Sequence, residues 1–121
     1  MNNQTVDIFN PKTIRATMGS IFRVPFVYVP DLAPVLAQMH AKGIRTYAAH
    51  LKGQEYYDSF SFREPTAFLI GNEGNGLSKE ISDQAGQYLK IPMEGRVESL
   101  NASIAAALLM YEAHRQRSAS L

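Results

Sequence analysis

The chain has 121 residues, of which 45% are hydrophobic and 19% are charged, values typical of one globular domain. Its net charge of +1 excludes a uniformly basic protein, so any nucleic-acid surface must be local. The absence of cysteine excludes disulfides and thiolate metal sites and favours a cytoplasmic location. No apolar run approaches the roughly 20 residues of a membrane span, and no signal peptide is recognisable.

The first predicted helix begins after Asn10, which is a favoured N-cap residue, and Pro11 suits the first helical position. Apolar side chains then recur at helical spacing, at Ile14, Met18, Ile21 and Phe22. This pattern predicts a helix that runs to about residue 22 and buries its apolar face.

Two strands and a helix are predicted between residues 26 and 49. Residues 26–29 are typical of a strand, as are residues 44–49. Between them, Pro30 and Asp31 open a helix that ends at Gly43, a favoured residue just beyond a helix. The alternation of helix and strand predicts the α/β class, with a mostly parallel sheet and helices on both faces.

Residues 54–65 form a longer loop that contains four aromatic residues, Tyr56, Tyr57, Phe60 and Phe62. Aromatic side chains in a polar loop can stack on nucleic-acid bases. More often they anchor the loop onto its own domain, and both interpretations are open at this point.

A glycine-rich loop follows the next predicted strand, residues 67–70, whose uninterrupted apolar run predicts burial on both faces. The loop holds Gly71, Gly74 and Gly76 around one carboxylate, Glu73. Glycine suits positions with positive φ or positions where a ligand approaches bare backbone. Leu77 replaces the lysine of a P-loop, and the spacing does not match a dinucleotide-binding fingerprint. The alternative is a structural turn with a solvated acid.

A second polar loop follows the strand predicted at residues 88–91, after Ser78 opens a short helix to about residue 84. Proline ends the strand in the sequence Ile91-Pro92-Met93. Ser99 and Asn101 flank Leu100 directly before the last helix. Both residues are favoured N-caps, so capping alone can account for them.

The last predicted helix, residues 101–117, is apolar nearly all round. One stripe comprises Leu100, Ile104, Leu108 and Tyr111, and further apolar residues cover much of the remaining surface, among them Ala105, Leu109 and Met110. Such a helix must be covered on several sides, which predicts an intrachain contact and a homodimer interface. Basic residues in its last turn suit the helix dipole. The histidines His40 and His50 lack partners at ligand spacing, so no metal site is predicted.

Three separated blocks together resemble the SpoU (TrmH-like) family of RNA ribose 2′-O-methyltransferases, which belongs to the SPOUT superfamily. Residues 69–77 (LIGNEGNGL) resemble the family's second motif. Residues 91–93 (IPM) and 99–103 (SLNAS) resemble its third motif. Residues 10–22 (NPKTIRATMGSIF) resemble the helix between the first and second motifs. The resemblance covers nearly the whole chain, so residues 1–121 are identified as the knot-containing portion of such a domain.

The resemblance implies an S-adenosylmethionine cofactor bound in a C-terminal trefoil knot, with rRNA or tRNA as substrate and a homodimer formed through the C-terminal helix. The residues that it implies for the cofactor are Gly71, Ile91, Met93 and Leu100. The polar residues that it implies for the reaction site are Glu73, Ser99 and Asn101. We expect these polar groups to position the ribose and the motif loops rather than to act as strong bases.

The family's first motif, N-x-G-x-x-x-R, has no match in the sequence. Lys12 stands at the glycine position of the nearest candidate, and Arg15 comes one residue early. The chain is therefore expected to begin partway through the domain, without the first-motif arginine, which argues against catalysis by this polypeptide alone. The alternatives are a dimeric module that binds S-adenosylmethionine or RNA without turnover, and a purely structural oligomerisation domain.

Overall fold

The fold is described from a computed structural model of the chain, which describes residues 1, 7, 9–18, 20–49, 55–71, 76–91 and 102–118. The chain divides into two units, Met1–Leu32 and Ala33–Leu121, and each is described by itself.

The first unit contains the helix α1 (Pro11–Thr17) and the short 3-10 helix η1 (Ser20–Phe22). The predicted start is confirmed, because Asn10 Oδ1 accepts a hydrogen bond from the Lys12 N–H at 2.9 Å. The helix ends earlier than predicted, at Met18, whose φ of 52° lies in the left-handed region. The Met18 N–H donates to the Arg15 carbonyl instead of continuing the helical pattern.

The predicted burial of this helix is wrong within its own unit. No residue of α1 is buried, and Met18 and Phe22 are 90% and 70% exposed. A unit of this size has too little apolar surface to enclose a core. Phe9 and Phe26 still form an edge-to-face ring pair with centroids 5.9 Å apart.

Residues 26–29, predicted as a strand, form neither a strand nor a helix. Their backbone is hydrogen-bonded to the start of the chain. The Met1 ammonium group donates to the Val27 carbonyl at 3.0 Å, and the Val29 N–H donates to the Met1 carbonyl at 2.7 Å. The strand prediction is therefore wrong, because a strand requires a ladder partner, which local sequence does not reveal.

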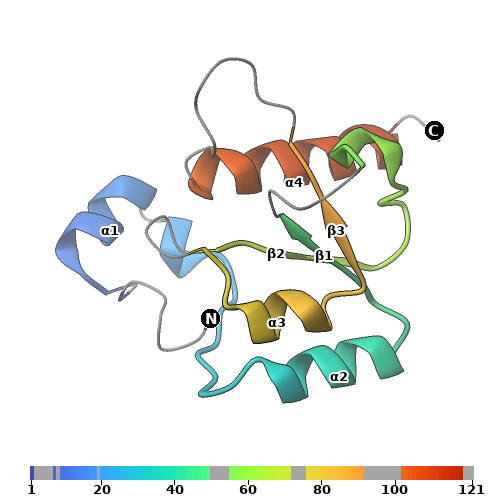
Figure 1. The fold of residues 1–121 in the computed structure, drawn as a ribbon. Coiled ribbons are helices and arrows are strands. Elements are labelled where there is room, and N and C mark those ends of the chain that lie inside the picture. Colours follow the sequence, from blue (N-terminus) through green and yellow to red (C-terminus); the bar gives the residue numbers. More distant parts are fainter. Residues whose placement is uncertain are drawn as a thin grey trace. The chain divides into compact units, whose positions relative to one another are not determined.

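The second unit is built on a parallel sheet with the order β2-β1-β3. Its elements in chain order are α2 (Ala33–Ala41), β1 (Arg45–Ala49), the 3-10 helix η2 (Tyr57–Ser59), β2 (Thr66–Leu69), α3 (Lys79–Gln84), β3 (Gln87–Leu89) and α4 (Ala102–Ser118). The helices α2 and α3 lie on one side of the sheet and α4 lies on the other (Figure 1). The predicted α/β class, with a parallel sheet and helices on both faces, is confirmed.

Local signals determine the ends of two helices in this unit. Gly43 follows α2 with a φ of +78°, its N–H donates to the His40 carbonyl, and the Ile44 N–H donates to the Met39 carbonyl. These two bonds form the glycine-dependent Schellman ending predicted for this helix. At the start of α3, Ser78 Oγ accepts a hydrogen bond from the Ile81 N–H at 3.3 Å.

Alternate side chains of β1 point to the two faces of the sheet. Tyr47 belongs to the core cluster under α4, and Ala49 packs against that cluster. On the other face, Thr46 Oγ1 lies 2.8 Å from His40 Nε2 and accepts a hydrogen bond from the Gly86 N–H at 2.8 Å. This one hydroxyl therefore links the end of α2 to the turn between α3 and β3.

Most of the aromatic rings in residues 54–65 pack against their own unit, which confirms that they anchor the loop. Phe62 is fully buried, and its ring meets the Tyr47 ring edge-on with centroids 5.1 Å apart. Phe60 and Tyr57 pack against the same cluster, whereas Tyr56 is 49% exposed. The following strand β2 is half-buried rather than fully buried, because it lies at an edge of the described sheet.

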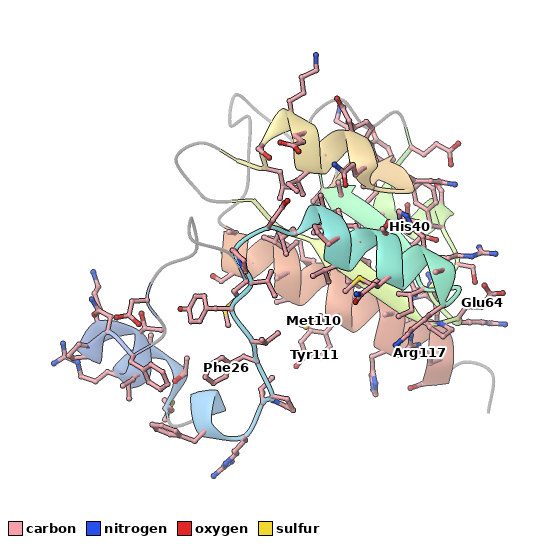
Figure 2. The ribbon with its side chains drawn as sticks, turned by 90° about the horizontal axis from the view of Figure 1, so that it is seen from below. Phe26, His40, Glu64, Met110, Tyr111 and Arg117 are labelled. Carbon is pink, nitrogen blue, oxygen red and sulfur yellow. The ribbon has the colours of Figure 1, made fainter. Side chains whose placement is uncertain are left out.

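The helix α4 has two distinct faces. Its buried residues are Ala105, Leu109, Glu112, Ala113 and Gln116. Its exposed apolar residues are Ile104, Leu108, Met110 and Tyr111, of which Figure 2 shows Met110 and Tyr111 projecting from the helix. The stripe predicted for this helix is thus largely the exposed face, whereas Leu109 lies in the chain's own core. Residues 92–101 lie outside the described residues, so the trefoil knot stays a prediction.

One buried carboxylate stabilises the C-terminal half of α4. Glu112 is only 9% exposed and accepts two hydrogen bonds from the Arg115 guanidinium, at 2.9 and 2.6 Å. These bonds, opposed by partial burial and assisted by a bond from Gln116, lower the pKa of Glu112 from 4.5 to about 2.

Acid should therefore remove this stabilisation. Because the folded-state pKa of Glu112 is lower than the ordinary value of 4.5, its contribution is present above that pH and is lost as the pH falls toward 2. We expect urea unfolding to show a steeper fall in the free energy of unfolding for the wild type than for Glu112→Gln over this window. The control is Glu64→Gln, which alters an exposed ion pair with Arg45 and should change stability by less than about 1 kcal/mol. Parallel pH profiles for the wild type and Glu112→Gln would contradict this account.

Candidate functional site

Because all three strands are parallel, their carboxyl ends lie side by side along one border of the sheet, which we call the carboxyl edge. Two predicted cofactor residues lie just beyond this edge. Leu69 of β2 is level with Ala48 of β1, and Leu89 of β3 is level with Ala49. Gly71 and Ile91 each lie two residues beyond these positions, on opposite sides of β1. The segments that follow β2 and β3 therefore begin at the same carboxyl edge, within one residue of the same level along β1.

This arrangement sets the width of the candidate site. Two strand spacings separate β2 from β3, so the two loops start roughly 10 Å apart across the end of β1. Ile91 is half-buried and packs against the core cluster, so one side of the gap is apolar. Gly71 contributes only backbone on the other side. Ligands of open parallel sheets commonly bind at such a carboxyl edge.

The remaining predicted site residues lie outside the described residues, namely Glu73, Met93, Ser99, Leu100 and Asn101. Their assignments stay predictions. The described residues on either side of these segments are Gly71 and Gly76 for the first, and Ile91 and Ala102 for the second. Both loops thus connect to the edge described above, and the second leads into α4.

Gly71 has a structural requirement of its own. A Cβ atom built on Gly71 would lie 2.5 Å from the carbonyl carbon and 2.7 Å from the Cα of Gly76. The backbone of the same loop therefore occupies the space where a side chain would be. Gly76 itself has a φ of +66°, which confirms the positive φ expected of a glycine in this loop.

Residues 55–57, which were not predicted to belong to the site, pair with the backbone of the chain directly after β3. The Lys90 N–H donates to the Glu55 carbonyl at 2.9 Å, and the Tyr57 N–H donates to the Lys90 carbonyl at 2.9 Å. Tyr56 therefore forms a parallel bridge with Lys90, the residue directly before Ile91. No local pattern signals this pairing, because the two segments lie more than 30 residues apart in the sequence.

The described residues contain neither a candidate metal site nor a candidate membrane span. Within them, no three histidine, cysteine or acidic side chains group closely enough to bind a metal ion. The helices that they form include none with the length and hydropathy needed to cross a bilayer.

Comparison with known proteins identifies relatives along most of the chain. A family model described as the SpoU rRNA methylase family matches residues 1–111. A TrmH family tRNA/rRNA methyltransferase of Staphylococcus haemolyticus is 39% identical over 103 residues, which are 85% of this chain and 41% of that protein. The chain thus spans about two fifths of the length of this curated relative.

Several solved structures also resemble the chain in sequence and fold. The SpoU methyltransferase AviRb from Streptomyces viridochromogenes, in complex with the cofactor AdoMet, is 35% identical. It superposes with a TM-score of 0.89 over 98% of this chain and 49% of that chain. A structure described as an RNA 2′-O ribose methyltransferase is 33% identical, with a TM-score of 0.81 over 93% of this chain and 43% of that chain.

Substituting Gly71 should displace the first loop. In Gly71→Ala the new methyl group would collide with backbone atoms of Gly76, and we expect a loss of stability of about 1–3 kcal/mol, as in overpacked cores. The matched control is Gly76→Asn, because a Cβ there meets nothing within 4 Å and asparagine tolerates positive φ. Thermal unfolding of the two variants checks the difference. Equal melting temperatures for Gly71→Ala and the wild type would contradict the close approach.

Proposed function

Because the chain belongs to the SpoU rRNA methylase family, we propose that it is the cofactor-binding portion of an S-adenosylmethionine-dependent RNA methyltransferase. The proposed acceptor is a ribose 2′-hydroxyl of rRNA or tRNA. The observation that carries the proposal is that Gly71 and Ile91 lie at the same carboxyl edge, on opposite sides of β1. Relatives described as AdoMet-bound and as 2′-O ribose methyltransferases support it.

The described part of the edge suits an adenosyl ligand. Bare backbone at Gly71 can form hydrogen bonds to a polar ring edge, and the half-buried Ile91 offers an apolar surface to a ring face. We propose that Met93 and Leu100 complete the cofactor-binding set. The two loops that carry these residues would then enclose the ligand between β2 and β3.

When bound, S-adenosylmethionine supplies an electrophilic methyl group on its sulfonium sulfur. In the proposed reaction that methyl group would pass to the ribose 2′-oxygen, S-adenosylhomocysteine would be the leaving group, and the hydroxyl proton would be released to water. We propose that Glu73, Ser99 and Asn101 orient the ribose and the loops, since positioning alone can supply much of a rate enhancement. A free carboxylate is a much weaker base than a ribose alkoxide, so Glu73 is proposed as an orienting group.

A second candidate function is a module that binds S-adenosylmethionine or RNA without methyl transfer. Such a module would use the same carboxyl end of the sheet.

Two measurements on the full chain test these proposals. We expect calorimetry to detect binding of S-adenosylmethionine. The absence of any heat would rule out the methyltransferase and any module that binds S-adenosylmethionine. Transfer of a labelled methyl group to a mixed rRNA and tRNA pool then separates them. Alkaline hydrolysis of the product supports the methyltransferase only if it leaves the labelled nucleotide resistant to cleavage, since a 2′-O-methyl group blocks attack on the adjacent phosphate. Binding without transfer would support the module.

We also propose that the chain forms a homodimer through the exposed apolar face of α4. Ile104, Leu108 and Tyr111 recur at positions i, i+4 and i+7, and they are 51%, 38% and 74% exposed. Exposed large side chains arranged in one stripe are typical of a protein interface. Polar residues expected on the outer face of a solvated helix are replaced here by leucine, isoleucine and tyrosine.

Adjacent leucines on α4 allow a matched test of this interface. Leu108→Glu should remain folded but give the light-scattering mass of one chain, because the charge would lie in the proposed interface. Leu109→Glu should instead lose cooperative unfolding, since Leu109 is fully buried in the chain's own core. A mass of two chains for folded Leu108→Glu, or of one chain for the wild type, would contradict the proposed dimer.

A further inference from the structure

The buried carboxamide of Gln116 connects α4 to a loop more than 50 residues earlier in the chain. Gln116 is 8% exposed, and its Nε2 donates to the Phe60 carbonyl at 2.9 Å. Its Oε1 accepts a hydrogen bond from the Phe62 N–H at 2.6 Å. One side chain therefore bonds to two peptide groups of the loop, at the half-buried Phe60 and the buried Phe62.

The orientation of this carboxamide is set by Glu112. Gln116 Nε2 also donates to Glu112 Oε1 at 3.1 Å. An ionised carboxylate can only accept hydrogen bonds, so the amide nitrogen must face it and the amide oxygen must face Phe62. The Arg115 guanidinium keeps Glu112 ionised by lowering its pKa to about 2. We call Gln116, Glu112 and the peptide groups of Phe60 and Phe62 the Gln116 network.

The same loop is bonded at its other end to the candidate site. Residues 55–57 form two backbone hydrogen bonds with Lys90, both 2.9 Å long, directly before Ile91. Tyr57 and Phe60 pack against the core cluster between the two attachment points. Residues 55–62 therefore run as one attached segment from the carboxyl end of β3 to the C-terminal half of α4.

The hydrogen bonds add directional contacts to an apolar face of α4 that is made mostly of short side chains. Two of its three core-facing apolar residues are alanines, Ala105 and Ala113. Apolar burial is non-directional, and short side chains interlock little with the sheet. Gln116 lies roughly 20 Å along the helix from Ala102, so a rigid helix transmits any axial shift to its first turn. That turn begins directly after the predicted site residues Leu100 and Asn101.

We propose that Gln116 is a positioning residue for the cofactor site. By attaching α4 to residues 60–62, alongside the bonds that Arg117 donates to the Phe62 and Glu64 carbonyls, it helps to set the axial position of the helix. Through residues 55–57 it helps to set where the chain leaves β3 at Ile91. Gln116 itself touches neither cofactor nor substrate. This inference rests on the proposed binding of S-adenosylmethionine at the carboxyl edge.

The test compares S-adenosylmethionine affinity in variants with and without the Gln116 network. Gln116→Met retains the length and the packing of the side chain but loses its three hydrogen bonds. We expect its affinity, measured by calorimetry below its melting temperature, to fall by about tenfold or more, as when an outer-shell partner of a site is lost. Amide hydrogen exchange at Phe62 should accelerate in the same variant, because its N–H loses its acceptor.

The control is Leu36→Ala, which removes a buried side chain from α2 on the other face of the sheet. It should lower the melting temperature but leave the affinity within about twofold of the wild type, because distant sites usually act independently. If Gln116→Met does not fold, Glu112→Gln provides the milder perturbation, and faster exchange at Phe62 should again accompany weaker binding.

The possible failures are distinguishable. Wild-type protein that binds no S-adenosylmethionine would overturn the proposed function and this inference with it. Wild-type binding that Gln116→Met retains at full affinity, despite faster exchange at Phe62, would overturn the positioning role alone. Equal loss of affinity in Leu36→Ala and Gln116→Met would also overturn it, since general destabilisation would then explain both.

Discussion

The parallel pairing of β1 with both of its neighbours is the constraint on which the second unit depends. β1 contributes four residues of register with β2 and three with β3, so the three strands point the same way. Parallel strands bring their carboxyl ends to one edge, and whatever follows them in the sequence must meet there. The two motif loops follow β2 and β3, which places their starting points together although some 20 residues separate Gly71 from Ile91.

The two faces of this sheet are covered in physically different ways. Under α4, the contact is apolar and aromatic, with Tyr47 packed against Phe62 and Leu109. On the opposite face, Thr46 Oγ1 joins α2 to the turn before β3 by hydrogen bonds. Hydrogen bonds also hold the C-terminal end of α4, where Arg117 donates to the carbonyls of Phe62 and Glu64. Figure 2 labels Arg117 and Glu64. The aromatic loop is thus held by both kinds of interaction, which suits a segment that borders the candidate site.

Part of the candidate site could be predicted from the sequence because its motifs are contiguous. The family resemblance implied Gly71 and Ile91, and the structure places both just beyond the carboxyl ends of β2 and β3. Their role in cofactor binding stays a prediction. The contribution of residues 55–57 could not be predicted, since it consists of backbone hydrogen bonds to Lys90 that carry no side-chain signature. The hydrogen bonds of Gln116 could not be predicted either, because its partners lie 54 and 56 residues away. In the sequence, Gln116 is only one polar residue near a helix end.

The family, the fold class and local boundaries such as the Asn10 cap and the turn at Gly43 could be predicted from the sequence, because they depend on neighbouring residues. Which apolar surfaces are buried became clear only from the folded chain. A helix that is apolar nearly all round does not reveal that Leu109 faces the sheet and Leu108 faces outward. Burial depends on what the remainder of the chain places opposite each side chain, and that information is not contained in any local pattern.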